Sequence, residues 1–213
     1  MTIPLVLASA SPARLATLRG AGIEPLVIVS EIDEDAVLNE ARAADPHLTP
    51  ARAVLLLAKA KALDVADRHA THGLVLGCDS ALELDGEFMG KPTTPDVARE
   101  RWRSMRGRSG VLHTGHWLVD ARRTDEGGTG KAAGESSSTL VRFGDLSDAE
   151  VDAYVATGEP LNVAGAFTVD GLGGPFVEGI DGDHHGVVGV SLPLMRYLLT
   201  HVGVTVPELW NRA

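Results

Sequence analysis

The sequence predicts an α/β protein whose strands form a mixed β-sheet. Along the first half of the chain, short apolar runs alternate with helical stretches, a pattern typical of parallel strands joined by helices. In the second half, extended runs follow one another through turns, as in antiparallel hairpins. The 213 residues are enough for one sizeable domain or two small lobes.

Composition and charge argue against several classes of protein. The formal net charge of −10 argues against binding to a nucleic acid polymer or an anionic membrane. No apolar run approaches the ~18 residues of a membrane span, and the apolar N-terminus lacks the basic segment of a signal peptide. The single cysteine, Cys78, cannot form an internal disulfide, which fits a reducing cytoplasm. We therefore expect a cytoplasmic protein.

The first candidate site is the turn between a strand expected over Pro4–Ser9 and a helix. Ser11 is a good N-cap, and Pro12 fits the first helical position. Such a helix N-terminus presents free N–H groups and a positive dipole end to an anion, and the hydroxyls of Ser9 and Ser11 add donors. Arg14 opposes that dipole, which suggests a phosphate contact. The alternative is an ordinary turn with a surface arginine.

The next elements carry two more candidates. After a strand expected over Leu26–Val29, the four carboxylates of Glu31–Asp35 indicate a solvated loop or, through Glu34, a ligand for a hard divalent cation. A helix is expected over about 49–69. Lys61 lies on its apolar face, so the ammonium either reaches solvent at the edge or points into a polar cleft. We favour the cleft.

The central stretch, Leu74–Pro92, combines a buried strand with an aspartate and a lysine. Its apolar start predicts the strand, and Asp85–Gly86 predicts a hairpin turn. A carboxylate at the end of a buried strand needs a metal ion, a cation or a substrate as its partner, so Asp79 is a candidate for chemistry. Lys91 on the return arm would join it around a metal-bound phosphate. Alternatively, Asp79 caps a turn and Lys91 is a solvated charge.

The following elements are expected to complete the sheet and the helices that pack on it. A helix starts at Thr94–Pro95, and the five arginines over 99–108 indicate a solvated or dimer-facing surface. A turn and a strand are expected over 108–120. The polar, glycine- and serine-rich segment Glu126–Ser138 predicts a flexible hairpin loop, and Thr139–Phe143 predicts a strand.

The last third of the chain begins with a capping box at Ser147–Glu150, which starts a helix. The glycine-rich segment Gly158–Gly174 indicates close backbone packing around a pocket, to which Asp170 contributes a charge. Asp181–Gly186 resembles a metal-binding loop, but Asp-Gly-Asp is also a common turn, which we favour. The last helix begins at Leu192.

Ordered motifs along nearly the whole chain resemble those of the Maf-like nucleoside triphosphate pyrophosphatases. The matching segments are Leu7–Arg14, Ile32–Glu34, Leu57–Ala62, Leu76–Ser80, Gly90–Pro92, Gly107–Gly115, Gly158–Gly171, Gly182–Asp183 and Val187–Pro193. The resemblance implies a single domain over 1–213, with an elongated, twisted mixed β-sheet flanked by helices and a central cleft between two lobes. It also implies a cytoplasmic homodimer that hydrolyses nucleoside triphosphates, common or modified, to the monophosphate and pyrophosphate with Mg²⁺ or Mn²⁺.

The resemblance also implies roles for individual residues. Asp79 takes the position of the proton acceptor, and the polar cleft positions fall on Ser9, Arg14, Glu34, Lys61 and Lys91. The subfamily that acts on thymidine and uridine triphosphates has arginine, threonine and glutamine where this chain has Ala13, Ser80 and Asp170. Asn162–Val163 also replaces an Asp-Lys pair. We expect Ala13, Ser80 and Asp170 to belong to the substrate site, and they do not by themselves assign the base.

These residues together predict phosphoryl transfer to water. A divalent ion would bridge Asp79 and Glu34 to the triphosphate, the serines and cations of the cleft would neutralise the phosphates, and Asp79 would orient or deprotonate the attacking water. Covalent catalysis by Cys78 is not expected, because adjacent side chains on a strand point to opposite faces. The alternatives are a catalytically weak, nucleotide-binding regulator of cell division and an inosine triphosphate pyrophosphatase.

Overall fold

Seven strands of the described chain form one mixed sheet. The computed structural model describes residues 2–69 and 72–211. The strands are β1 (Leu5–Leu7), β2 (Leu26–Val27), β3 (Leu74–Leu84), β4 (Glu87–Met89), β5 (Ser109–Asp120), β6 (Ala132–Phe143) and β7 (Val177–Asp181). Their order is β2-β1-β3-β5-β6-β7, with β4 paired to β3. Since β1 is parallel to β2 and β3 and the later strands pair in antiparallel fashion, the predicted mixed α/β fold is confirmed.

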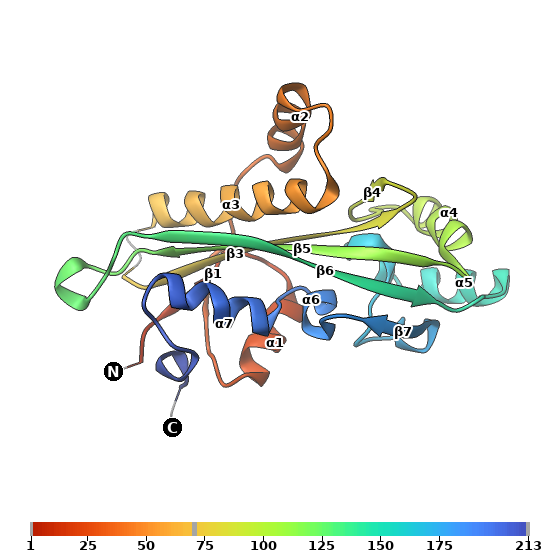
Figure 1. Cartoon of the computed structure of the whole chain (residues 1–213). Helices are drawn as coiled ribbons and strands as arrows, with labels where there is room; N and C mark the ends of the chain where they lie inside the picture. The colour runs from red at the N-terminus through yellow and green to blue at the C-terminus, as the bar shows by residue number, and fades with distance from the viewer. Residues whose placement is uncertain (1, 70–71, 212–213) are drawn as a thin grey trace.

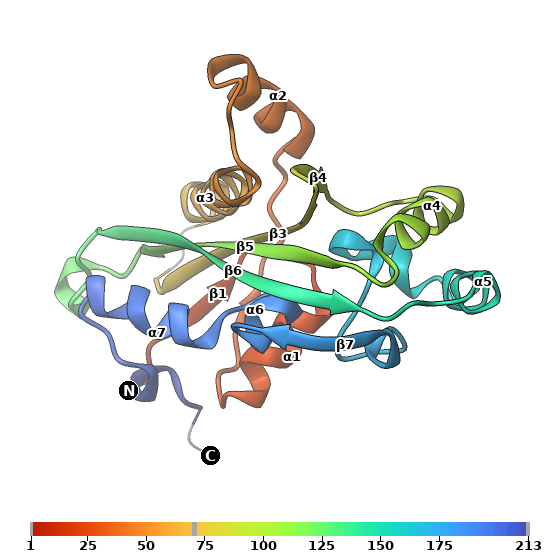
Figure 2. The ribbon, with the colours of Figure 1, turned by 45° about the vertical axis from the view of Figure 1, so that its right-hand side comes forward.

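Helices cover both faces of this sheet. The α-helices are α1 (Pro12–Gly20), α2 (Glu34–Ala44), α3 (Pro50–Arg68), α4 (Pro95–Met105), α5 (Asp148–Ala156), α6 (His184–Val188) and α7 (Leu192–His201). The 3-10 helices are η1 (Thr124–Glu126), η2 (Glu159–Asn162), η3 (Ala164–Ala166), η4 (Gly174–Phe176) and η5 (Val206–Leu209). Helix α3 lies along one face, and α1, α6 and α7 lie on the other (Figure 1). Helix α2 stands away from the sheet beyond α3 (Figure 2).

The helix starts follow from local sequence. Ser11, Thr49, Thr94 and Ser191 each accept a hydrogen bond from a backbone N–H in the first turn, and a proline occupies one of the first two helical positions after each. At that place the missing proline N–H removes no helical hydrogen bond. The capping box predicted at the start of α5 is also present. These starts are therefore confirmed.

Two hydrophobic cores lie toward opposite ends of the long strand β3. The first core holds Leu74 and Leu76 against β1, α1 and α7. The second holds Leu82 and Leu84 against α4 and α5, with Trp102 at edge-to-face ring distances of 5.8 Å from Phe143 and 5.6 Å from Tyr154. One continuous strand thus serves both lobes, and its middle residues lie where the two cores part.

The prediction of a flexible loop over Glu126–Ser138 was wrong for most of that segment. Strand β6 begins at Ala132 and pairs with β5 along its whole length. Its small residues are required by the packing, because a Cβ on Gly134 would lie 2.1 Å from the Trp117 ring. Ser136 donates to the carbonyl of Ala51 at the start of α3. Gly134 and Ser136 therefore fit contacts with Trp117 and with the start of α3.

The interpretation of Glu31–Asp35 as a loop was also incomplete. Helix α2 begins at Glu34, and Asp33 caps it by accepting from the N–H of Ala36. The strand expected over Leu26–Val29 is shorter than predicted, since only Leu26–Val27 pairs with β1. The expected turn after Arg108 is instead the first part of β5. Among the helices of 2–69 and 72–211, none combines the length and apolar character needed to cross a membrane.

Candidate active site

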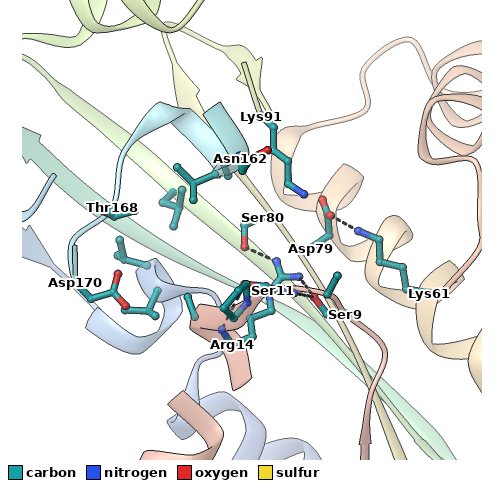
Figure 3. A pocket seen from close by; sticks show the side chains of 18 of the residues that line it. Ser9, Ser11, Arg14, Lys61, Asp79, Ser80, Lys91, Asn162, Thr168 and Asp170 are labelled. Atoms are coloured by element: carbon teal, nitrogen blue, oxygen red, sulfur yellow. Dashed lines mark hydrogen bonds and ion pairs between the residues drawn. The ribbon is translucent and has the colours of Figure 1, made fainter. Parts of the chain in front are cut away.

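A cleft of about 530 Å³ opens where the two cores part, and all ten residues proposed from the sequence line it. One part, here called the charged end, is lined by Ser9, Ser11, Arg14, Glu34, Lys61, Asp79 and Lys91. The other, the glycine-rich end, is lined by Asn162–Ala164 and Phe167–Asp170. Asp170 and Thr168 lie across the cleft from Asp79 and Lys61 (Figure 3). Ala13 and Ser80 line the same cleft.

Asp79 is the buried acid of the charged end. It lies in the middle of β3 with 8% of its surface exposed, and its Oδ1 accepts a hydrogen bond from Lys61 Nζ at 2.6 Å. Burial raises the pKa of Asp79 above its ordinary value, and the charges of Lys61 and Arg14 offset part of that rise. An aspartate with a raised pKa is a stronger base than a free one, which suits proton transfer near neutral pH.

Close crossing of α3 over the sheet brings Lys61 to Asp79. A Cβ on Gly77 would lie 2.1 Å from the carbonyl oxygen of Ala58, and a Cβ on Gly115 would lie 2.4 Å from that of Val54. Real Cβ atoms do not approach so near, so only glycine permits this crossing. Lys61 is consequently 7% exposed and points into the cleft, as the sequence analysis favoured.

Lys61 also joins Glu34 to the site. Its Nζ lies 2.9 Å from Glu34 Oε1, and the Glu34 side chain is about half exposed. One ammonium thus stands between the two carboxylates that were proposed to hold a metal. Within the described ranges, no group of three or more His, Cys, Asp or Glu side chains is arranged to hold a metal ion. A divalent cation here would need oxygens from outside the protein, as Mg²⁺ does when one or two carboxylates and substrate phosphates ligate it.

Arg14 is buried beneath the turn that precedes α1. Its guanidinium makes four hydrogen bonds, to Ser9 Oγ, Ser80 Oγ and the carbonyls of Cys78 and Gly189. An arginine has five N–H donors, so most of them are already engaged by the protein. The cation adds positive charge to the cleft while it ties α1, β3 and the end of α6 together.

The hydroxyl of Ser80 belongs to a hydrogen-bond chain that runs across the sheet. It accepts from Arg14 at 3.0 Å and lies 2.9 Å from Thr114 Oγ1. Thr114 donates its proton to the carbonyl of Gly186 at 2.8 Å, so Ser80 must donate to Thr114. Thr114 is completely buried and was missed as a site residue, because its partners are distant in sequence.

Two serines and a lysine complete the charged end. Ser11 caps α1 by accepting from the N–H of Arg14 at 3.4 Å, and Ser9 Oγ accepts from the N–H of Ser11 at 3.3 Å. Lys91 follows β4, is exposed and points toward Asp79 (Figure 3). Three cations and two carboxylates therefore gather here, in a chain whose net charge is −10. Local positive charge of this kind suits a small polyanion.

The glycine-rich end has a different construction. Asp170 is exposed at its rim, and the backbone around it follows η2, η3 and η4 in place of regular helices or strands. Gly165 and Ala166 both have positive φ, at 67° and 61°, so the chain turns sharply here. Glu159 accepts several hydrogen bonds from this segment. It was missed, although it lies in a motif that the sequence analysis singled out.

Two other sequence interpretations concern Cys78 and the Asp181–Gly186 loop. Cys78 is buried in the first core, away from the cleft lining, and burial raises the pKa of its thiol to about 11. In the loop, Asp183 caps α6 by accepting from the N–H groups of His185 and Gly186, which agrees with the preferred interpretation as a turn.

Comparison with known proteins identifies close relatives. The family model described as Maf-like protein matches residues 4–202. A protein of Leifsonia xyli subsp. xyli is 52% identical over 98% of this chain and 97% of its own length, and one of Nocardia farcinica is 54% identical over 99% and 98%. Both are described as nucleoside triphosphate pyrophosphatase. Among solved structures, the Ham1 protein of Staphylococcus aureus matches with a TM-score of 0.37 and 13% identity, over 67% of this chain and 72% of that chain.

Proposed function

The chain belongs to the family of Maf-like proteins, and on that premise we propose that it is a nucleoside triphosphate pyrophosphatase. It hydrolyses a nucleoside triphosphate to the monophosphate and pyrophosphate. The observation that carries the proposal is the buried Asp79, held by Lys61 at the end of a cleft where cations and a helix N-terminus converge. Relatives more than 50% identical over nearly the full length bear the same description.

In the proposed mechanism, Asp79 accepts a proton from the water that attacks the α-phosphorus. Lys61 and Lys91 neutralise charge on the phosphates, and the N–H of Ala13 at the start of α1 donates to a phosphate oxygen. Phosphoryl transfer depends mainly on positioning and charge neutralisation, so a site without a covalent nucleophile is sufficient. Arg14 contributes through its charge and by holding Ser9 and Ser80 in place.

A divalent cation, Mg²⁺ or Mn²⁺, is proposed to enter with the triphosphate. Asp79 and Glu34 are the residues that would hold it, and it would polarise phosphate oxygens and the bound water. The chemistry of these donors fits, because hard cations prefer carboxylate and phosphate oxygens. Lys61 Nζ lies 2.6 Å from Asp79 Oδ1 and 2.9 Å from Glu34 Oε1, so the second oxygen of each carboxylate would be the one to ligate the metal.

The glycine-rich end is proposed to receive the nucleoside. Asp170 is its charged side chain, and a carboxylate only accepts hydrogen bonds. Bases that offer amino or imino donors to Asp170 should therefore be preferred to bases that present mainly carbonyl oxygens. Ala13 and Ser80 are proposed to shape the same selectivity. We also propose that the enzyme is a cytoplasmic homodimer.

The test is pyrophosphate release from a panel of ribo- and deoxyribonucleoside triphosphates. The panel includes inosine triphosphate and methylated bases, with Mg²⁺ or Mn²⁺ and with a chelator as control. We expect pyrophosphate as the product, loss of release on chelation, and a ranking that changes in Asp170→Asn. Nucleotide binding without turnover would overturn the proposal in favour of a binding regulator. A clear preference for inosine triphosphate would instead favour clean-up of deaminated nucleotides.

A further inference from the structure

We infer that Glu159 is a positioning residue that holds the nucleoside-binding segment Thr168–Asp170 in its binding shape. The inference rests on the proposed function, because it assigns this segment to the nucleoside. Glu159 opens η2 and does not line the cleft itself. It therefore acts through the residues that it holds.

The carboxylate of Glu159 is the centre of a hydrogen-bond network. Its Oε1 accepts from Thr168 Oγ1 at 2.5 Å, from Tyr154 Oη at 3.0 Å and from the N–H of Gly173 at 3.0 Å. Its Oε2 accepts from the N–H of Leu172 at 3.0 Å. Four donors thus converge on one side chain. Hydrogen bonds to an ionised acceptor are stronger than those between neutral groups.

These contacts hold both ends of the segment that reaches the cleft. Thr168 lies at its start, and Leu172 and Gly173 lie just after it. Of the three residues between these two attachments, Val169 and Asp170 line the cleft. A short stretch fixed at both ends has few alternative conformations, so Asp170 is presented at a defined place on the rim.

The glycines of the segment show that the chain closes tightly around the carboxylate. A Cβ on Gly171 would lie 2.6 Å from Glu159 Oε2, and a Cβ on Gly173 would lie 2.5 Å from Tyr154 Oη. At Gly173 the added Cβ would also lie 2.7 Å from the carbonyl oxygen of Thr168, so this position excludes a larger side chain. The backbone at Gly171 and Gly173 therefore wraps closely around Glu159 and its partner Tyr154.

The charge of Glu159 is part of the network. Burial alone would raise the pKa of this carboxyl, but the hydrogen bonds from Thr168, Leu172 and Gly173 outweigh burial and lower it. Glu159 is therefore ionised at neutral pH and can accept from all four donors at once. A neutral amide at this position has only one acceptor oxygen and would turn its NH₂ group toward a donor.

The test compares Glu159→Gln with Glu178→Gln, a matched change at an exposed glutamate on β7. For the preferred nucleoside triphosphate, we expect Glu159→Gln to raise KM about tenfold, the size expected for partial loss of this network. We expect kcat to stay within about threefold and the preference among bases to weaken. Inhibition by inorganic tripolyphosphate, which probes the charged end alone, should not change. Glu178→Gln should match the wild type.

A second variant separates this role from a general loss of structure. Tyr154→Phe removes one donor to Glu159 and keeps the aromatic ring in the second core. It should therefore raise KM by about threefold, less than Glu159→Gln does. Equal losses of nucleotide and tripolyphosphate binding in Glu159→Gln would overturn the inference, as would unchanged KM and base preference. If the wild-type protein releases no pyrophosphate from any nucleotide, the proposed function is refuted, and so is the role of Glu159 that rests on it.

Discussion

The charged end and the glycine-rich end of the cleft are held in place in different ways. At the charged end, Asp79, Lys61 and Arg14 extend from a long strand and two helices, and each is fixed by a charged or buried partner. At the glycine-rich end, the lining comes from 3-10 turns and loops. Its shape depends on polar groups behind the lining, above all Glu159 and Trp102.

In the proposed function, the two ends have separate tasks. The triphosphate is common to all candidate substrates, and its chemistry needs charges at constant positions, which regular elements supply. The base differs among nucleotides, and an irregular segment can change its lining residues without disturbing the sheet. Substitutions at the charged end should therefore affect kcat and stability, whereas substitutions behind the glycine-rich end should affect KM and base preference.

The largest expected effect is that of Asp79→Asn. The amide cannot accept the proton from the attacking water, so kcat for pyrophosphate release should fall about a thousandfold or more. The matched control is Asp85→Asn in the turn of the same hairpin, where the left-handed φ of 54° is one that asparagine tolerates. Its kcat should equal that of the wild type. Retention of a tenth of the activity in Asp79→Asn would contradict the assignment of chemistry to this end.

Arg14→Lys tests whether a cation at the charged end also supports the fold. A lysine cannot serve the four acceptors of Arg14 together, and each buried acceptor left unpaired costs about 1–3 kcal/mol. We expect the free energy of unfolding, measured in urea, to drop by about 3 kcal/mol. Arg19→Lys, in an exposed pair with Glu24, should change it by less than about 0.5 kcal/mol. Equal effects would mean that the buried network adds no stability.

His116 should make the charged end sensitive to acid. It is fully buried, accepts from the N–H of Ser191 at 2.8 Å, and burial lowers its pKa to about 4. The unfolded chain takes up this proton near pH 6.5, so the free energy of unfolding should fall as the pH drops from 6.5 to 4, by up to about 3 kcal/mol. Urea unfolding across this range would show a smaller pH dependence in His116→Gln. An identical dependence would contradict the assignment.

The smallest effect is expected behind the glycine-rich end, from Trp102→Phe. This change keeps an aromatic ring in the second core but removes the Nε1–H that donates to the buried carbonyl of Ala166 at 2.7 Å. We expect a loss of about 1–2 kcal/mol in unfolding free energy and a raised KM with little change in kcat. The exposed Trp210 provides the control, since Trp210→Phe should change neither quantity. A fall in kcat alone would break the proposed separation between the two ends.

Much of the fold could be predicted because its signals are local. A cap followed by proline marks the starts of α1, α3, α4 and α7, and a capping interaction involves residues within one turn. Helix α2 was missed because its cap, Asp33, stands in an acidic run that is also typical of loops. The second part of β6, Thr139–Phe143, was predicted as a strand, but its first part was missed. The small residues of that first part contact Trp117 and Ala51, which lie on other elements.

The candidate site was likewise predictable from the sequence only in part. Local motifs and the family resemblance together were sufficient to name ten residues that line the cleft, including the acid, both lysines and the serine turn. Only the folded chain decides that Lys61 lies between Asp79 and Glu34, that most donors of Arg14 are taken up by the protein, and that Glu159 and Thr114 support the lining. These contacts join positions such as Arg14 and Gly189, 175 residues apart. Their energies depend on burial and on distances of a few ångströms, which arise only when the two lobes close on the shared strands.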